Sequence, residues 1–84
     1  MTLGERLRQL RNEQRLTSVQ MAVIIGKSRP AISGYESGNE PSFTVLVRYA
    51  DYFGMTVQQL IEPVDFSTLL SNEYIPLPWM DGDA

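Results

Sequence analysis

Short apolar runs at helical spacing, each bounded by a capping residue or a glycine, fill the first 61 residues of the chain. In the run at 2–14, leucines recur every three to four residues, which places them on one face of a helix. Serine or threonine, a proline or a terminal glycine delimits the runs that follow, at 17–26, 28–38, 42–54 and 56–61. No part of this region alternates apolar and polar residues as a half-buried strand does. The pattern therefore predicts five short helices.

The third run shows how closely these boundary signals are spaced. Ser28 is expected to cap the helix, and Pro30 falls in its first turn, where the missing N–H costs nothing. Gly38 can supply the left-handed residue that ends it. In the fourth run we expect one buried side, which consists of Phe43, Leu46, Val47, Ala50 and Phe53.

Length and composition exclude several functions. A chain of 84 residues, 43% of them hydrophobic, makes one small domain with little room for a deep catalytic cleft. The absence of cysteine and histidine excludes disulfides, thiolate chemistry, histidine acid–base catalysis and the usual zinc sites. We therefore expect no enzyme, no metal and no cofactor. The longest clean apolar run, residues 21–25, is too short to span a bilayer, and residues 1–11 lack a signal-peptide core, so we expect a soluble, cytoplasmic protein without membrane contact.

Charge is divided unevenly along the chain, although the net charge is only −3. Residues 1–61 carry all seven basic residues against five acidic ones, which gives +2. Residues 62–84 carry five acidic residues and no basic one. The chain is therefore expected to consist of a mildly basic helical domain at 1–61 and an acidic tail at 62–84.

The tail is too apolar for a plain acidic extension. Its two prolines, Pro76 and Pro78, favour an extended or polyproline-like path. Three uses stay open: packing on its own helices, pairing with a second copy, or docking onto a different protein. The candidate dimer or partner contacts are Phe66, Leu69, Leu70, Tyr74, Ile75, Leu77 and Trp79.

The segments LGERLRQLR, TSVQMAVIIGKSRPAISGYESG, PSFTVLVRYADYFGM and TVQQLI, in this order, resemble the bacterial and phage helix-turn-helix regulators of the Xre, Cro and phage-repressor family. The resemblance covers about residues 3–61. It implies an all-α, five-helix bundle of the lambda-repressor type with a C-terminal extension, in which the second and third helices bind double-stranded DNA. Its most specific part is the ordered set Arg11, Ala22, Gly26, Ser28, Ile32, Ser33, Glu36, Gly38, Pro41 and Leu60.

The resemblance places the recognition helix at about residues 28–37, with its base-reading positions at Ser28, Arg29, Pro30, Ser33 and Gly34. Only Arg29 has the forked donors that bind guanine O6 and N7 together, and Gly34 has no side chain to read with. Lys27 is expected to meet phosphates, which stabilise a cation that the helix N-terminus otherwise disfavours. Ser18 and Asn39 stand where relatives carry glutamine and a basic residue, which predicts a weaker clamp on the DNA backbone.

The resemblance also implies one structural ion pair, between Arg11 of the first helix and Glu36 at the end of the recognition helix. A departure from the family pattern lies on the second helix, where Val19 and Val23 replace polar residues and share a face. Two interpretations of these valines stay open. They either enlarge the core or stand harmlessly exposed, or they form a small contact patch for another chain.

Together these features predict a sequence-specific DNA-binding transcription regulator. We expect a repressor that binds an inverted-repeat operator as a homodimer, with the fourth and fifth helices and the tail as the dimer surface. The alternative is an antitoxin-like or anti-repressor module that keeps the helix-turn-helix shape and uses its tail to bind a protein partner.

Overall fold

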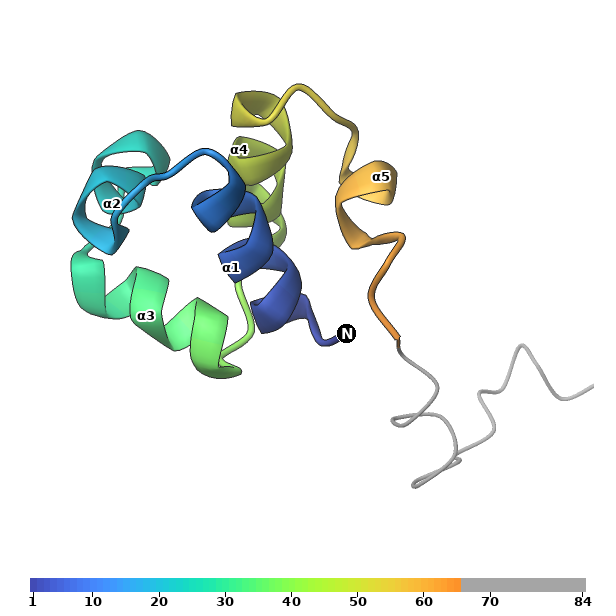
Figure 1. The fold of residues 1–84 in the computed structure, drawn as a ribbon, viewed down its shortest axis with the longest axis horizontal. Coiled ribbons are helices and arrows are strands. Elements are labelled where there is room, and N and C mark those ends of the chain that lie inside the picture. Colours follow the sequence, from blue (N-terminus) through green and yellow to red (C-terminus); the bar gives the residue numbers. More distant parts are fainter. Residues whose placement is uncertain (66–84) are drawn as a thin grey trace, which may run out of the picture.

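The computed structural model describes residues 1–65, which form five α-helices and no strand (Figure 1). The helices are α1 (Leu3–Glu13), α2 (Ser18–Ile25), α3 (Arg29–Ser37), α4 (Phe43–Tyr52) and α5 (Val57–Ile61). The predicted all-α, five-helix fold class is confirmed. No helix within this part of the chain is long and apolar enough to cross a membrane. The predicted contact residues between Phe66 and Trp79 lie outside the described residues.

All five helices begin with a capping hydroxyl. The side chains of Thr2, Thr17, Ser28, Ser42 and Thr56 each accept a hydrogen bond from a backbone N–H three residues on. Such caps satisfy N–H groups that have no partner inside the helix. Helix boundaries in this chain are therefore set by local hydrogen bonds, and the short connections leave few ways to arrange the helices.

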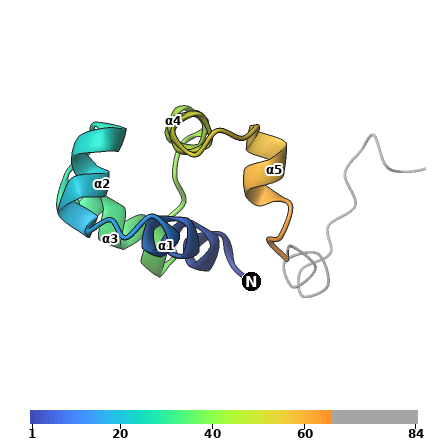
Figure 2. The ribbon, with the colours of Figure 1, turned by 45° about the horizontal axis from the view of Figure 1, so that its top comes forward.

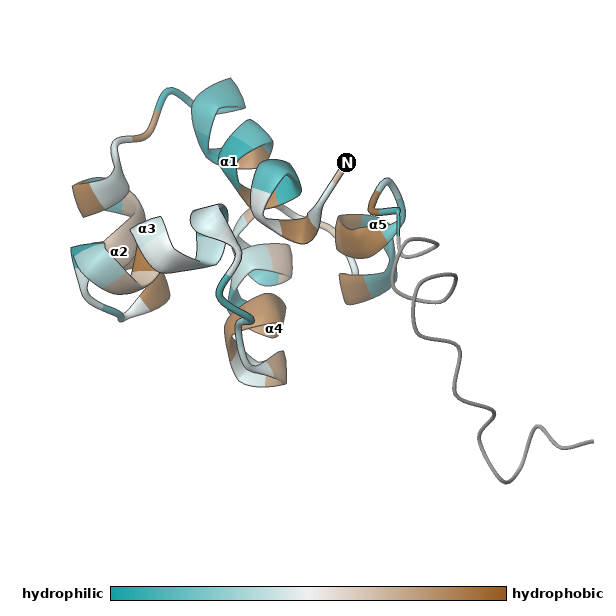
Figure 3. Cartoon of the chain, turned by 90° about the horizontal axis from the view of Figure 1, so that it is seen from below, coloured by the Kyte–Doolittle hydropathy of each residue, from teal (hydrophilic) through white to brown (hydrophobic). Residues whose placement is uncertain are grey.

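One core joins the five helices. α1 packs on α3 and α5, α2 packs on α3 and α4, and α4 also contacts α5. In Figure 2, α4 is seen nearly end-on between α2 and α5. Figure 3 shows α1 as mostly hydrophilic, with hydrophobic residues distributed over the other helices. The buried apolar cluster consists of Leu7, Leu10, Met21, Ala22, Ile25, Ile32, Val45, Tyr49, Ala50 and Leu60.

The buried face of α4 agrees with the expected one at Ala50 and, partly buried, at Leu46 and Phe53, but differs at other positions. Val45, Tyr49 and Ala50 are buried, whereas Phe43 keeps 66% of its surface exposed. With about 3.6 residues per turn, Phe43 lies about a quarter turn from the centre of the buried stripe. Tyr49 is fully enclosed, and its hydroxyl forms no hydrogen bond with the described residues. Burial raises the pKa of Tyr49 well above its ordinary value, so the phenol stays neutral.

α1 and α3 approach each other most closely at Gly4. A Cβ atom on Gly4 would lie 2.5 Å from the backbone oxygen of Glu36 and 2.8 Å from that of Tyr35. Both obstructing atoms belong to the backbone of α3, so a rotamer change cannot relieve the clash. The crossing therefore requires a glycine at this position of α1.

The end of the described chain is tied to α1. Arg6 donates from Nε to the Leu60 carbonyl at 2.7 Å and from Nη2 to the Gln59 carbonyl at 3.2 Å. Val64 is buried, and the Asp65 N–H donates to the Met1 carbonyl at 2.8 Å. α5 and the segment after it are therefore held against the start of α1.

Gly4→Ala is expected to lower the free energy of unfolding by about 1–3 kcal/mol, the usual effect of overpacking a tight contact. Gly34→Ala is the matched control, because the atoms nearest to a Cβ there belong to the side chain of Asn39, and removing a helical glycine stabilises by up to about 1 kcal/mol. Urea denaturation of both variants and the parent measures the difference. A Gly4→Ala variant as stable as the parent would show that α1 and α3 can move apart without a loss of stability.

Candidate nucleic-acid interface

The turn between α2 and α3 is built from three residues. Gly26 ends α2 in the left-handed conformation (φ +78°), which glycine adopts without strain. The N–H groups of Gly26 and Lys27 both donate to the Ala22 carbonyl, at 2.8 and 3.0 Å. Ser28 then caps α3, because its Oγ accepts from the Ala31 N–H at 3.2 Å. The two helices pack against each other across this turn, which is the helix-turn-helix arrangement.

Arg48 of α4 supports the same turn from behind. Its Nη1 donates to the Ile25 carbonyl at 2.9 Å, at the end of α2 where carbonyls lack a helical partner. A Cβ atom on Gly26 would lie 3.3 Å from that nitrogen. This role cannot be predicted from the sequence, because no local pattern connects residues that lie 23 positions apart.

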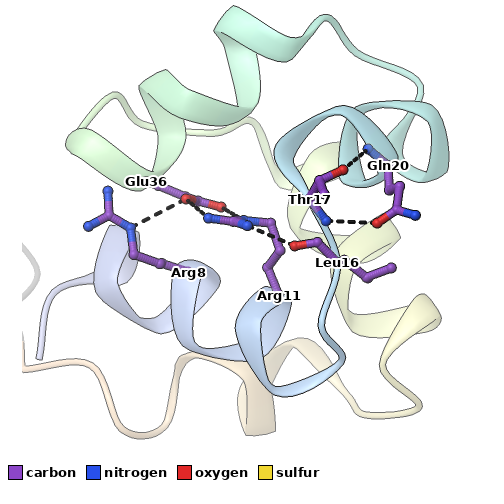
Figure 4. Close-up of polar contacts among 6 residues, drawn as sticks. All are labelled: Arg8, Arg11, Leu16, Thr17, Gln20 and Glu36. Carbon is purple, nitrogen blue, oxygen red and sulfur yellow. Dashed lines mark hydrogen bonds and ion pairs between the residues drawn. The ribbon is translucent and has the colours of Figure 1, made fainter.

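A buried ion pair fixes the far end of α3 to α1 (Figure 4). Arg11 donates from Nε to Glu36 Oε2 at 2.6 Å and from Nη2 to Oε1 at 3.0 Å, so the pair is bidentate. Its Nη1 donates to the Leu16 carbonyl at 2.8 Å. The Glu36 side chain is only 3% exposed, and the hydrogen bond to Glu36 raises the pKa of Arg11. The resemblance pairs these two residues, and here the pair joins α1 to the end of α3.

Arg8 adds a weaker contact to the same carboxylate. Its Nε lies 3.4 Å from Glu36 Oε1, and its side chain is 54% exposed (Figure 4). Solvent screens such a contact, so its contribution to stability is about 0–1 kcal/mol.

The cations of the described domain fall into two groups. Arg6, Arg8, Arg11 and Arg48 are bound to carbonyls or to Glu36, as described above. Within residues 1–65, the basic side chains that form no hydrogen bond or ion pair are those of Arg15, Lys27 and Arg29. Two of these three stand where the turn enters α3.

The structure gathers most of the predicted DNA-binding residues around the first two turns of α3. Lys27, Ser28, Arg29 and Pro30 follow one another through the turn into the helix, and all four are exposed. Ser33 and Gly34 stand one turn further along the same helix, the first exposed and the second half-buried. Ser18 is half-buried at the start of α2, and Asn39 is exposed just after α3.

Val19 and Val23 do not enlarge the core. Their exposed fractions are 56% and 78%, and they stand on the side of α2 away from its buried residues. Ile24 is half-buried and packs against the core. Of the sequence interpretations, harmless exposure and a contact patch remain.

The profile of the helix-turn-helix family matches residues 7–60, and the chain belongs to this family, in its Xre/Cro type. It is 35% identical over 74 residues to the HTH-type transcriptional activator BcrR of Enterococcus faecalis, over 87% of this chain and 36% of that protein. It is 40% identical over 67 residues to the HTH-type transcriptional regulator DdrOP3 of Deinococcus deserti, over 79% of this chain and 52% of that protein. The chain thus spans about half or less of the length of these relatives.

Solved structures share the fold at lower identity. The complex of the SinR and SinI proteins contains a chain that matches with a TM-score of 0.65 and 22% identity, over 84% of this chain and 77% of that chain. A crystal structure of iron(II) HppE in complex with substrate matches with a TM-score of 0.64 and 22% identity, over 92% of this chain and 44% of that chain. At this identity the likeness concerns the fold alone.

Glu36→Ala is expected to remove about 3–5 kcal/mol from the free energy of unfolding, because it leaves the Arg11 guanidinium without its partner. Arg8→Ala is the matched control at the same carboxylate, with an expected loss of about 0–1 kcal/mol. Thermal and urea unfolding of the three proteins measures both. A Glu36→Ala protein that melts within a degree or two of the parent would show that the pair does not hold α3.

Proposed function

We propose that this chain is a sequence-specific DNA-binding transcription regulator that reads the major groove with the first two turns of α3. The supporting observation is the distribution of cations. Four of the arginines bind backbone carbonyls or Glu36, whereas Lys27 and Arg29, at the N-terminal end of α3, form no hydrogen bond or ion pair within residues 1–65. That end carries the positive pole of the helix dipole, so both cations gain most from a polyanionic ligand.

The two cations take different parts in this proposal. Arg29 is the first residue of α3, and its guanidinium can donate two parallel hydrogen bonds to guanine O6 and N7. Lys27 lies in the turn, outside the helix, and contacts phosphates as a point charge. Ser28 uses one acceptor site of its hydroxyl oxygen as the helix cap, which leaves its O–H donor and one acceptor site for a ligand.

We also propose that the protein binds an inverted repeat as a homodimer and represses transcription by occupying its operator. A domain with three uncommitted cations engages few phosphates, so one copy alone binds weakly, and two linked copies bind far more tightly. Repression by occupancy requires only the DNA face that the described residues supply. In this role the protein catalyses no reaction and acts in the cytoplasm, where its operator DNA is.

Arg29→Ala is expected to relax specificity at one G·C pair in each half-site by about 1–3 kcal/mol. Lys27→Ala is the matched variant two residues away, which should weaken binding to all sequences alike and lower the salt slope by about 1. Selection of bound sequences from random duplex DNA, followed by titrations at two salt concentrations, measures both effects.

Three outcomes are decisive for that experiment. If Arg29→Ala lowers the affinity for selected and for random DNA equally, Arg29 does not read a base. If the parent protein enriches no sequence, the proposed function itself is wrong. A protein partner bound to the tail in that case would favour the anti-repressor alternative.

The selected sequences are expected to form an inverted repeat whose half-site centres lie about one helical turn, roughly 10 base pairs, apart. The reason is geometric, because two recognition helices related by a two-fold axis enter successive major grooves on one side of the duplex. Footprinting and the mass of the protein–DNA complex in solution test this. A single asymmetric half-site filled by one copy would contradict the dimer.

A further inference from the structure

Gly34 leaves a gap on α3 at a position that the proposed function directs toward DNA. It stands one helical turn beyond Pro30 and beside Ser33, yet it carries no side chain. The side chain of Asn39 occupies the space. A Cβ atom on Gly34 would lie 2.5 Å from Asn39 Nδ2, 3.4 Å from its Cγ and 3.7 Å from its Cβ.

The backbone after α3 brings Asn39 to this place. Gly38 ends α3 with a positive φ of +128°, which glycine adopts without strain. The N–H groups of Gly38 and Asn39 then both donate to the Gly34 carbonyl, the second at 2.8 Å. Asn39 is thus fixed by its own backbone against the residue whose missing side chain it replaces.

The carboxamide of Asn39 is free to bind a ligand. The residue is exposed, and within residues 1–65 its side chain forms no hydrogen bond. A primary amide offers donors and an acceptor side by side. Such a group pairs with adenine by donating to N7 and accepting from N6 in the major groove.

We propose that Asn39 reads an adenine in place of Gly34 and so determines specificity at one A·T pair in each half-site. This inference rests on the proposed function of α3. It gives Asn39 a base-reading role, in contrast to the phosphate position that the resemblance suggests for this residue. A phosphate contact would act on all sequences equally, so the two roles differ in a measurable way.

The test compares the sequences selected from random duplex DNA by the parent, Asn39→Ala, Gly34→Ala and the double variant. Asn39→Ala is expected to lose roughly tenfold of the preference at one A·T pair of each half-site. Gly34→Ala is expected to lose the same preference, because its methyl group displaces the amide. The double variant should lose no more than either single one, since both changes remove the same contact.

Glu40→Ala is the matched control, because Glu40 is the exposed neighbour of Asn39 in the same turn. It should raise affinity for all sequences, through loss of a negative charge, and change no base preference. Unfolding curves of all variants separate these effects from loss of fold. An even loss of affinity with an unchanged motif in Asn39→Ala would overturn the inference, as would an unchanged motif in Gly34→Ala. A parent without any enriched sequence would overturn the proposed function as well.

Discussion

The position of α3 depends on the buried carboxylate of Glu36. Its two oxygens accept from Arg11, and the same guanidinium donates to the Leu16 carbonyl in the segment that leads into α2. One ion pair therefore connects α1, the start of α2 and the end of α3. The backbone oxygen of Glu36 also lies against Gly4, so charge and close packing act at one point. Because a small domain is stable by only about 5–15 kcal/mol, this junction carries a large share of the total.

Three of the six arginines in this chain, Arg6, Arg11 and Arg48, donate to backbone carbonyls. Arg6 binds the last carbonyls of α5, and Arg48 binds that of Ile25 at the end of α2. Cations placed there also oppose the negative pole of each helix dipole. A count of charges by segment therefore does not show which cations have their donors already in use. The contacts of each side chain do, and Arg15, Lys27 and Arg29 are the basic residues without a contact within residues 1–65.

Local signals made most of the fold predictable. The Ser42 hydroxyl caps α4 by binding an N–H three residues on, and Gly26 ends α2 with a bond to a carbonyl four residues back. Because each signal acts over so few residues, it can be recognised in the sequence. The burial of Tyr49 in place of Phe43 was not predictable in this way, because the rotation of α4 depends on how α2 and α5 pack against it.

The candidate site also contains residues that the sequence predicts and contacts that it does not. The residues of the turn and Arg29 follow from the family pattern, since they are set by a short stretch of chain. Two contacts form only when the chain has folded. Arg48 binds the Ile25 carbonyl at the turn, and the Asn39 side chain lies against Gly34. Such contacts have no signature in spacing or composition.

The bond between the Asp65 N–H and the Met1 carbonyl has a consequence for assembly. It fixes the point where the chain leaves the described domain, next to the start of α1. In Figure 1 this exit and α5 lie at one side of the molecule, whereas α2 lies at the opposite side. The exit and the α2–α3 turn therefore lie on opposite sides of the described domain (Figure 1 and Figure 2). These two ends of the described domain can be contacted separately.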